Sequence, residues 1–259
     1  MKEISVSAKS LPEAYHKAIL ALYREGLVTP CPDYGQLQKE CSMTMEVVQP
    51  LAEPRVTRLF IGGHPDLQQY VMEVLDGILD FRIGSGWDYT YHSRIAEQLP
   101  FIYAELKRNP ESRRAVIDVR EWKHDTSPGN TSPACLQHMQ FFIRQGRLHL
   151  KVLMRSNDAP EATFMNAFAF IMLQKRVADT LGVEMGSYVH RANSFHCYQK
   201  DFPLLEAYAR SIESSDDICF DYEGFYKELM EESIPEILKK IEQLKSNTTE
   251  HTLNLQKEK

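Results

Sequence analysis

The chain lacks the sequence features of several broad protein classes. Its five cysteines are odd in number and scattered without a CxxC pair, so neither a disulfide framework nor a zinc ribbon is expected. It has no block of Lys or Arg, and its net charge of −6 gives no reason to expect a nucleic-acid or membrane partner. No apolar run is long enough to span a bilayer, and the N-terminus does not read as a signal peptide. We therefore expect a soluble protein of the reducing cytoplasm.

The motifs of several common enzyme classes are also missing. The chain has no Walker loop, no GxGxxG, no His pair at metal spacing and no GxSxG elbow, so no metal site is predicted. It has no internal repeat and no mid-chain linker. We expect a single α+β catalytic domain over residues 1–246, followed by a disordered polar tail over 247–259.

Apolar periodicity and turn residues outline the elements of this domain. Helices are predicted over 11–23, 66–79, 94–107, 162–181, 203–211 and 222–245. Strands are predicted over 43–48, 56–61, 115–119, 135–144, 148–155 and 187–198. The stretch 27–38 looks like a loop, Pro100 is expected to kink or split its helix, and Gln145-Gly146 is a hairpin turn.

Cys135 is the first candidate for chemistry, because it follows a proline-bearing loop at the start of a strand. A buried, inert cysteine is the more common alternative for a lone thiol. Arg155 and Ser156 end the strand that pairs with it, so the hairpin brings a phosphate-binding pair close to the thiol. A structural salt bridge between Arg155 and Asp158 is the competing interpretation for this arginine.

Other polar residues stand at positions suited to a ligand. Asn166 is near the start of an apolar helix, where its amide can donate and accept; a helix-start hydrogen bond is the alternative. His196 and Tyr198 share one face of a strand, or form a satisfied core pair. Glu73 is near the buried edge of its helix, where burial would raise its pKa and suit it to acid–base work. An exposed carboxylate is its alternative.

Two adjacent arginines, Arg113 and Arg114, precede a short strand. Neighbouring residues of an extended chain point to opposite faces, so both reach one phosphate only if the chain bends. A pair of solvated surface arginines is an equally good interpretation.

Taken together, these pieces resemble thymidylate synthase and the related pyrimidine nucleotide hydroxymethylases. The resemblance runs from the segment Leu106–Arg114 to Tyr198, and from Cys135 onward it needs no gap. It rests on the order Pro-x-Cys, Arg-Ser-x-Asp, Asn and His-x-Tyr. It implies a central mixed β-sheet with flanking helices, one sheet face being packed in a homodimer.

The resemblance also implies roles for residues. Cys135 would add to C6 of the pyrimidine ring, and C5 would then attack the methylene of 5,10-methylenetetrahydrofolate. Glu73, in Met72-Glu73-Val74, matches the acid–base glutamate. The other implied contacts are Asn166 to the base, Asp158 to base or folate, Arg155 and Ser156 to the phosphate, Arg113 and Arg114 to the phosphate of the other subunit, His196 and Tyr198 to the sugar, and Trp87 and Tyr91 near folate and base.

The chain departs from the family pattern in four places. Leu136 stands where a His usually follows the nucleophile, and the Arg loop near the N-terminus is not recognisable, with Lys39 or Gln38 as substitutes. The segment around Trp87 is shortened and has no second tryptophan. The C-terminus is a charged helix with a polar tail instead of a short apolar one.

These features lead to a ranked set of functions. Asn166 and the His196/Tyr198 pair favour dUMP as the substrate. Methyl transfer giving dTMP is slightly preferred, and hydroxymethylation of dUMP or (d)CMP, with water in place of hydride, is a close second. A binding or regulatory protein without turnover and an unrelated cysteine hydrolase are the remaining alternatives.

Overall fold

The protein is built on one mixed β-sheet, as the sequence and the resemblance predict. The computed structural model describes residues 1–214 and 218–257. In sheet order the main strands are β1 (Glu3–Ala8), β3 (Gln36–Val47), β8 (Glu184–Tyr198), β7 (Arg147–Asp158), β6 (Leu136–Arg144) and β5 (Val116–Asp118), with β2 (Leu27–Cys31) paired to β3. A separate ribbon joins β4 (Val56–Thr57) to β9 (Cys219–Phe220).

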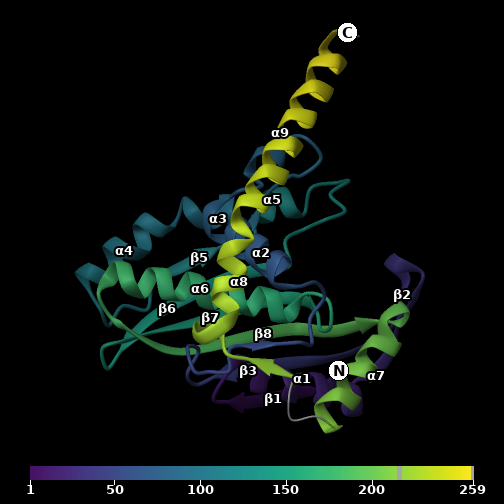
Figure 1. The fold of residues 1–259 in the computed structure, drawn as a ribbon, viewed down its shortest axis with the longest axis vertical. Helices are drawn as coiled ribbons and strands as arrows, with labels where there is room; N and C mark the ends of the chain where they lie inside the picture. Colours follow the sequence, from purple (N-terminus) through teal and green to yellow (C-terminus); the bar gives the residue numbers. More distant parts are fainter. Residues whose placement is uncertain (215–217, 258–259) are drawn as a thin grey trace.

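Helices flank this sheet. They are α1 (Leu11–Glu25), α2 (His64–Asp76), α3 (Tyr91–Ala96), α4 (Leu99–Arg108), α5 (Trp122–Asp125), α6 (Thr163–Leu181), α7 (Phe202–Ser214), α8 (Lys227–Glu232) and α9 (Ile234–Lys257). Short turns of helix add η1 (Pro32–Tyr34), η2 (Asp80–Arg82), η3 (Gln199–Asp201) and the π-turn η4 (Tyr222–Tyr226). Figure 1 shows α2, α3, α4 and α6 together on one side of the sheet.

The hairpin β6–β7 and the crossover β7–α6–β8 position the site. Gln145 and Gly146 both have positive φ (52° and 74°), the geometry of a tight two-residue hairpin turn. Strands β7 and β8 are parallel, so a crossover must join them, and α6 is that crossover. Because α6 buries apolar residues around most of its surface, it is held in the core against the sheet.

Strands β6 and β7 are fully buried on only one face of the sheet. Along β6 and β7, buried side chains alternate with partly or fully exposed ones. This alternation means that one face of the hairpin packs against helices while the other is open in the single chain.

Several predicted elements differ from the structure. The stretch 27–38, predicted as a loop, forms strand β2, the turn η1 and the start of β3, because β2 pairs antiparallel with β3. Strand β1 was not predicted; it has parallel pairing with β3, which local pattern does not reveal. The strand predicted over 56–61 is only Val56–Thr57.

The expected effect of Pro100 is confirmed. The helix predicted over 94–107 is split into two helices, α3 and α4, and Pro100 occupies the first turn of α4. A proline is tolerated there because its missing N–H would have no partner in any case.

The C-terminal helix is longer than predicted. Helix α9 continues through Lys257, whereas a disordered tail is expected over 247–259; Glu258 and Lys259 are outside the described residues. No proline or glycine follows Pro235 to end the helix. Within the described chain, no helix is long and apolar enough to cross a membrane.

Candidate active site

Cys135 is located where the loop from α5 enters β6. Its side chain is partly exposed, and its Sγ is 3.5 Å from the Ser156 Oγ on the neighbouring strand. The Arg155 N–H donates to the Cys135 carbonyl oxygen at 2.8 Å, and the Leu136 N–H donates to the Tyr91 hydroxyl at 3.3 Å. The backbone at Cys135 and Leu136 is therefore held by hydrogen bonds, and the partly exposed thiol is accessible to a ligand.

Arg155 turns toward the loop that precedes the thiol. Its guanidinium donates to the carbonyl oxygens of Pro133 (2.9 Å) and Ala134 (3.2 Å), and its Nη1 is 3.3 Å from the Ser156 Oγ. These contacts replace the salt bridge to Asp158 that was the competing interpretation. They bring the guanidinium, the hydroxyl and the thiol together.

A cavity of about 430 Å³ lies between α2 and the segment that leads into α3. It is lined by Tyr70, Glu73, Val74, Leu79, Gly86, Trp87, Asp88, Tyr89, Thr90, Tyr91 and Ser132. Ser132 belongs to the loop before Cys135, so the cavity and the thiol are neighbours. Burial raises the pKa values of Tyr89 and Tyr91, and the proximity of Cys135 adds to the rise for both.

Glu73 lines this cavity from α2. Burial raises the pKa of its carboxyl group, and the hydrogen bond from Gln69 Nε2 to Oε1 at 2.8 Å, with the cations Arg82 and Lys240, opposes that rise. The exposed-carboxylate alternative is thus not what the structure shows. A carboxyl group with a raised pKa beside a cavity is suited to proton transfer.

The opposite wall is aromatic. Trp87 is 36% exposed and the Arg82 guanidinium is 4.8 Å from its ring centre. Tyr89 and Tyr91 follow, with ring centres 6.2 Å apart. The wall thus offers flat rings for a planar ligand.

Asn166 is buried at the start of α6, with its side chain toward Tyr70. The Tyr70 hydroxyl donates to the Asn166 Oδ1, and burial raises the pKa of Tyr70 well above its usual range. Because Oδ1 accepts this bond, the side-chain orientation of Asn166 is set by α2. The amide nitrogen remains as its donor group.

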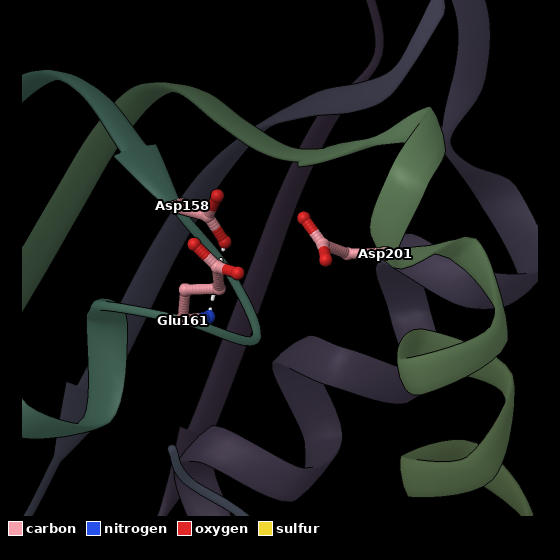
Figure 2. Close-up of side chains that lie close together, drawn as sticks. All are labelled: Asp158, Glu161 and Asp201. Carbon is pink, nitrogen blue, oxygen red and sulfur yellow. Dashed lines mark hydrogen bonds between the residues drawn. The ribbon is translucent and has the colours of Figure 1, made fainter. Parts of the chain in front are cut away.

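Asp158 belongs to a group of three carboxylates at the end of β7. Figure 2 shows its side chain with those of Glu161 and Asp201. One carboxylate oxygen from each of the three residues lies within 4.8 Å of the other two. Burial raises the pKa of Asp158 to about 7, and the two neighbouring carboxylates add to the rise. Lys200 pairs with both neighbours, at 3.2 and 3.4 Å. The group has the oxygen ligands of a cation site, but this lysine already supplies positive charge.

His196 and Tyr198 do share one region, as their spacing predicts. Their ring centres are 4.8 Å apart, and His196 is the pairing partner of Asp158 across the β7–β8 ladder. His196 Nδ1 lies 3.2 Å from the Ser194 carbonyl oxygen, and burial lowers the His196 pKa. The ring of Tyr34, from η1, approaches Tyr198 at 4.9 Å.

Arg113 and Arg114 are exposed and distant from the thiol of their own chain. They precede β5, and the pairing of Val116 with Gln140 places Arg114 opposite Phe142. Six residues of β6 then separate this level from Leu136, which is roughly 20 Å of strand. The two arginines therefore do not join the Cys135 site within one chain.

The residues named as substitutes for the N-terminal arginine loop have other partners. Lys39 Nζ donates to the Tyr23 carbonyl oxygen and lies 5.2 Å from the Tyr23 ring centre. Gln38 is paired with Tyr198 in the β3–β8 ladder. Lys39 is thus held against α1.

Some residues of the site were not foreseen. Tyr70 lies at helical spacing among apolar residues of α2, and the need of a tyrosine hydroxyl for a hydrogen-bond partner was an available signal. Tyr89 falls between Trp87 and Tyr91 in an alternating aromatic pattern that also could have been read. A buried chain from Tyr188 through His190 to Asn157, with links of 2.8 and 2.7 Å, had no such signal.

Comparison with known proteins identifies a family to which this chain is similar. Residues 68–251 match the family model described as thymidylate synthase. The putative thymidylate synthase of Methanocaldococcus jannaschii is 29% identical over 219 residues, covering 79% of this chain and 96% of that protein. The thymidylate synthase of Bacillus licheniformis is 30% identical over 133 residues, which is 49% of this chain and 47% of that one.

A solved structure resembles this one in fold. Thermostable thymidylate synthase A from Bacillus subtilis superposes with a TM-score of 0.62 at 18% identity, covering 78% of this chain and 84% of that chain. At this identity the likeness concerns the fold alone.

Proposed function

Because the chain belongs to the thymidylate synthase family, whose members are enzymes that transfer one-carbon units, we propose that it modifies C5 of a pyrimidine nucleoside 5′-monophosphate. The substrate is dUMP, the one-carbon donor is 5,10-methylenetetrahydrofolate, and the product is dTMP. The reaction passes through a covalent adduct of Cys135 at C6, within a single catalytic domain over residues 1–246.

One observation carries this proposal: the thiol, a hydroxyl and a guanidinium meet beside the cavity. Cys135 Sγ is 3.5 Å from Ser156 Oγ, which in turn is 3.3 Å from Arg155 Nη1. Arginine and serine donors suit a phosphate, and a phosphate held there brings the attached nucleotide to the thiol. His196 and Tyr198, on the next strand, are available to the sugar hydroxyl.

The base is read by Asn166. Its Oδ1 accepts from Tyr70, so its NH₂ group is presented to the base. The O4 carbonyl of uracil accepts such a donor, whereas the 4-amino group of cytosine repels it. This supports dUMP over dCMP.

The cavity suits the planar ring of a folate. Trp87, Tyr89 and Tyr91 offer aromatic faces, and Asp88 offers a carboxylate to the N–H groups of a pterin. The donor supplies a methylene group and, for methyl transfer, a hydride. Asp158, at the end of β7, contributes to the site through its backbone and water.

The residues of the chain take the following parts. The Cys135 thiolate adds to C6, which makes C5 the carbon nucleophile that forms a bond to the methylene. Glu73 moves protons at O4 through water. The C5 proton is lost and the bond between the methylene and the folate nitrogen breaks, so that an exocyclic methylene remains on C5 and tetrahydrofolate is the leaving group. A hydride to that methylene, with release of Cys135, gives dTMP and dihydrofolate.

A hydroxymethylase is the second candidate. Helix α9 packs on Met72 and Leu79, and none of its described residues lines the cavity. A cavity open to solvent allows water to add to the methylene, giving a hydroxymethyl product and tetrahydrofolate.

The proposed enzyme is a homodimer. Arg113 and Arg114 are roughly 20 Å along the strand from Cys135, so they serve a phosphate only in a second subunit. The open face of the β6–β7 hairpin is the surface for that subunit. Cytoplasmic location accords with five cysteines that are scattered along the sequence without a CxxC pair.

Mass spectrometry of the nucleotide tests the proposal. The protein is incubated with methylenetetrahydrofolate and dUMP, with dCMP and CMP in parallel, and Cys135→Ala is the control. We expect dTMP with dihydrofolate from dUMP and none from the control. A hydroxymethyl product with tetrahydrofolate selects the second candidate, and no product from any nucleotide refutes both.

A further inference from the structure

Helix α9 forms a small apolar core of its own with α2 and with the turn and η2 that follow it. Ile237 and Ile241 are 5% and 2% exposed and pack with Met72 and Leu79. Partly buried residues extend this cluster, namely Ile78, Phe81, Ile234 and Leu244. Figure 1 shows α9 crossing the region of α2 before it extends beyond the rest of the chain.

The same cluster reaches the cavity. Leu79 packs against Ile237 and Ile241 and also lines the cavity. Met72 is the neighbour of Glu73, which lines the cavity from the same helix. The apolar residues of α9 therefore support, from outside, the wall that carries Glu73.

A hydrogen-bond network links this support to the aromatic wall. Asp80, next to Leu79, accepts from the Thr90 hydroxyl at 2.5 Å and is 2.6 Å from His92 Nδ1. Gly77 has a φ of 64°, and a Cβ there would lie 2.2 Å from His92 Nδ1, so the chain is closely packed at this point. A displacement of Leu79 is thereby passed to the segment that includes Tyr89 and Tyr91.

We propose that Ile237 and Ile241 are positioning residues that set the cavity wall, and thereby the affinity of the site for the folate donor. This inference rests on the proposed function. The residues proposed to hold the phosphate and the sugar are elsewhere, because Arg155 and Ser156 belong to β7 and His196 to β8. Loss of the α9 contacts therefore weakens folate binding much more than nucleotide binding.

The test compares two residues of the same helix. Ile241→Ala removes a buried side chain, and Leu238→Ala, at a position 44% exposed, is the matched control. Both are made in the full chain, with Ile241→Val as a milder variant that keeps most of the packing. The readouts are the KM for methylenetetrahydrofolate and the KM for dUMP.

A second readout needs no turnover. The chain has two tryptophans, and Trp122→Phe leaves Trp87 in the cavity wall as the single reporter. Quenching of its fluorescence measures binding of tetrahydrofolate, which cannot transfer a carbon.

We expect Ile241→Ala to raise the folate KM and Kd by about 10-fold and the dUMP KM by less than about 2-fold, since a small misplacement of site groups is costly. Ile241→Val should restore most of the affinity, and Leu238→Ala should match the unmodified protein. Equal changes for both ligands, or equal behaviour of Ile241→Ala and Leu238→Ala, overturn the inference. An unmodified protein without turnover or folate binding overturns the proposed function instead, and the inference with it.

Discussion

The hydrogen bond from Tyr70 to Asn166 makes a sharp prediction about base selection. Tyr70→Phe removes the hydroxyl that donates to the Asn166 Oδ1 and keeps the aromatic ring at this position of α2. Without that donor, the amide of Asn166 can rotate and present either its oxygen or its nitrogen to the base. The variant should therefore accept dCMP better, relative to dUMP, than the unmodified enzyme.

The size of the effect follows from the groups involved. Asn166 is 6% exposed, so water does not readily replace the lost donor. One such hydrogen bond contributes about 0.5–1.5 kcal/mol net. At about 1.4 kcal/mol for each factor of ten, the ratio of kcat/KM for dUMP to that for dCMP should fall by about 2- to 12-fold.

The assay measures kcat/KM for both nucleotides in parallel with urea unfolding. Tyr15→Phe is the matched control, because the fully buried Tyr15 donates to the Ala159 carbonyl oxygen at 3.0 Å, away from the base. Both variants should lose a similar free energy of unfolding, on the order of 1 kcal/mol. An unchanged dUMP/dCMP ratio in Tyr70→Phe, or the same fall in Tyr15→Phe, would refute the reasoning about Asn166.

Three further predictions concern other parts of the molecule. Burial and two carboxylate neighbours raise the pKa of Asp158 to about 7, so the folded protein holds a proton that the unfolded chain releases, and stability falls as pH rises from about 4 through 7. Asp158→Asn should flatten this part of the profile in urea unfolding and raise the free energy of unfolding at pH 8 by up to ~4 kcal/mol, with no gain at pH 4; parallel profiles would contradict this. Asn157→Leu leaves the buried His190 Nε2 without its hydrogen-bond partner at 2.7 Å, and should lower the free energy of unfolding by about 1–3 kcal/mol. An unchanged midpoint of urea unfolding would show that the Tyr188–His190–Asn157 hydrogen bonds contribute little to stability. Mixing inactive Cys135→Ala with a weakened Arg113→Ala variant should restore activity, because hybrid dimers contain one site with both native residues, and a mixture no more active than its parts would rule out a shared site.

Much of the fold was accessible from local pattern. The β6–β7 hairpin follows from two alternating strands around Gln145-Gly146, and α6 follows from its long apolar run closed by Gly182. The errors occur where pairing decides the structure. The strand β2 reads as a loop, because only its partner β3 satisfies its backbone, and β1 joins the sheet through parallel pairing with residues about 40 positions away.

Some features of the candidate site were likewise predictable from the sequence, and others were not. The spacing of Cys135, Arg155 and Ser156 along a hairpin was enough to predict that they meet, because antiparallel strands bring the ends of the hairpin together. The partner of Asn166 was not predictable, since Tyr70 is on another helix 96 residues away. Nor could spacing reveal that Lys200 lies among the carboxylates near Asp158.

The sequence by itself determined the residue types, the hairpin and the family resemblance, because these depend on short-range periodicity and on the order of residues along the chain. Only the tertiary structure decided the wall of the cavity, the orientation of Asn166 and the place of α9 against Leu79. Those features depend on burial and on contacts between segments far apart in sequence, where the pKa of Glu73 and the partners of buried polar groups are set.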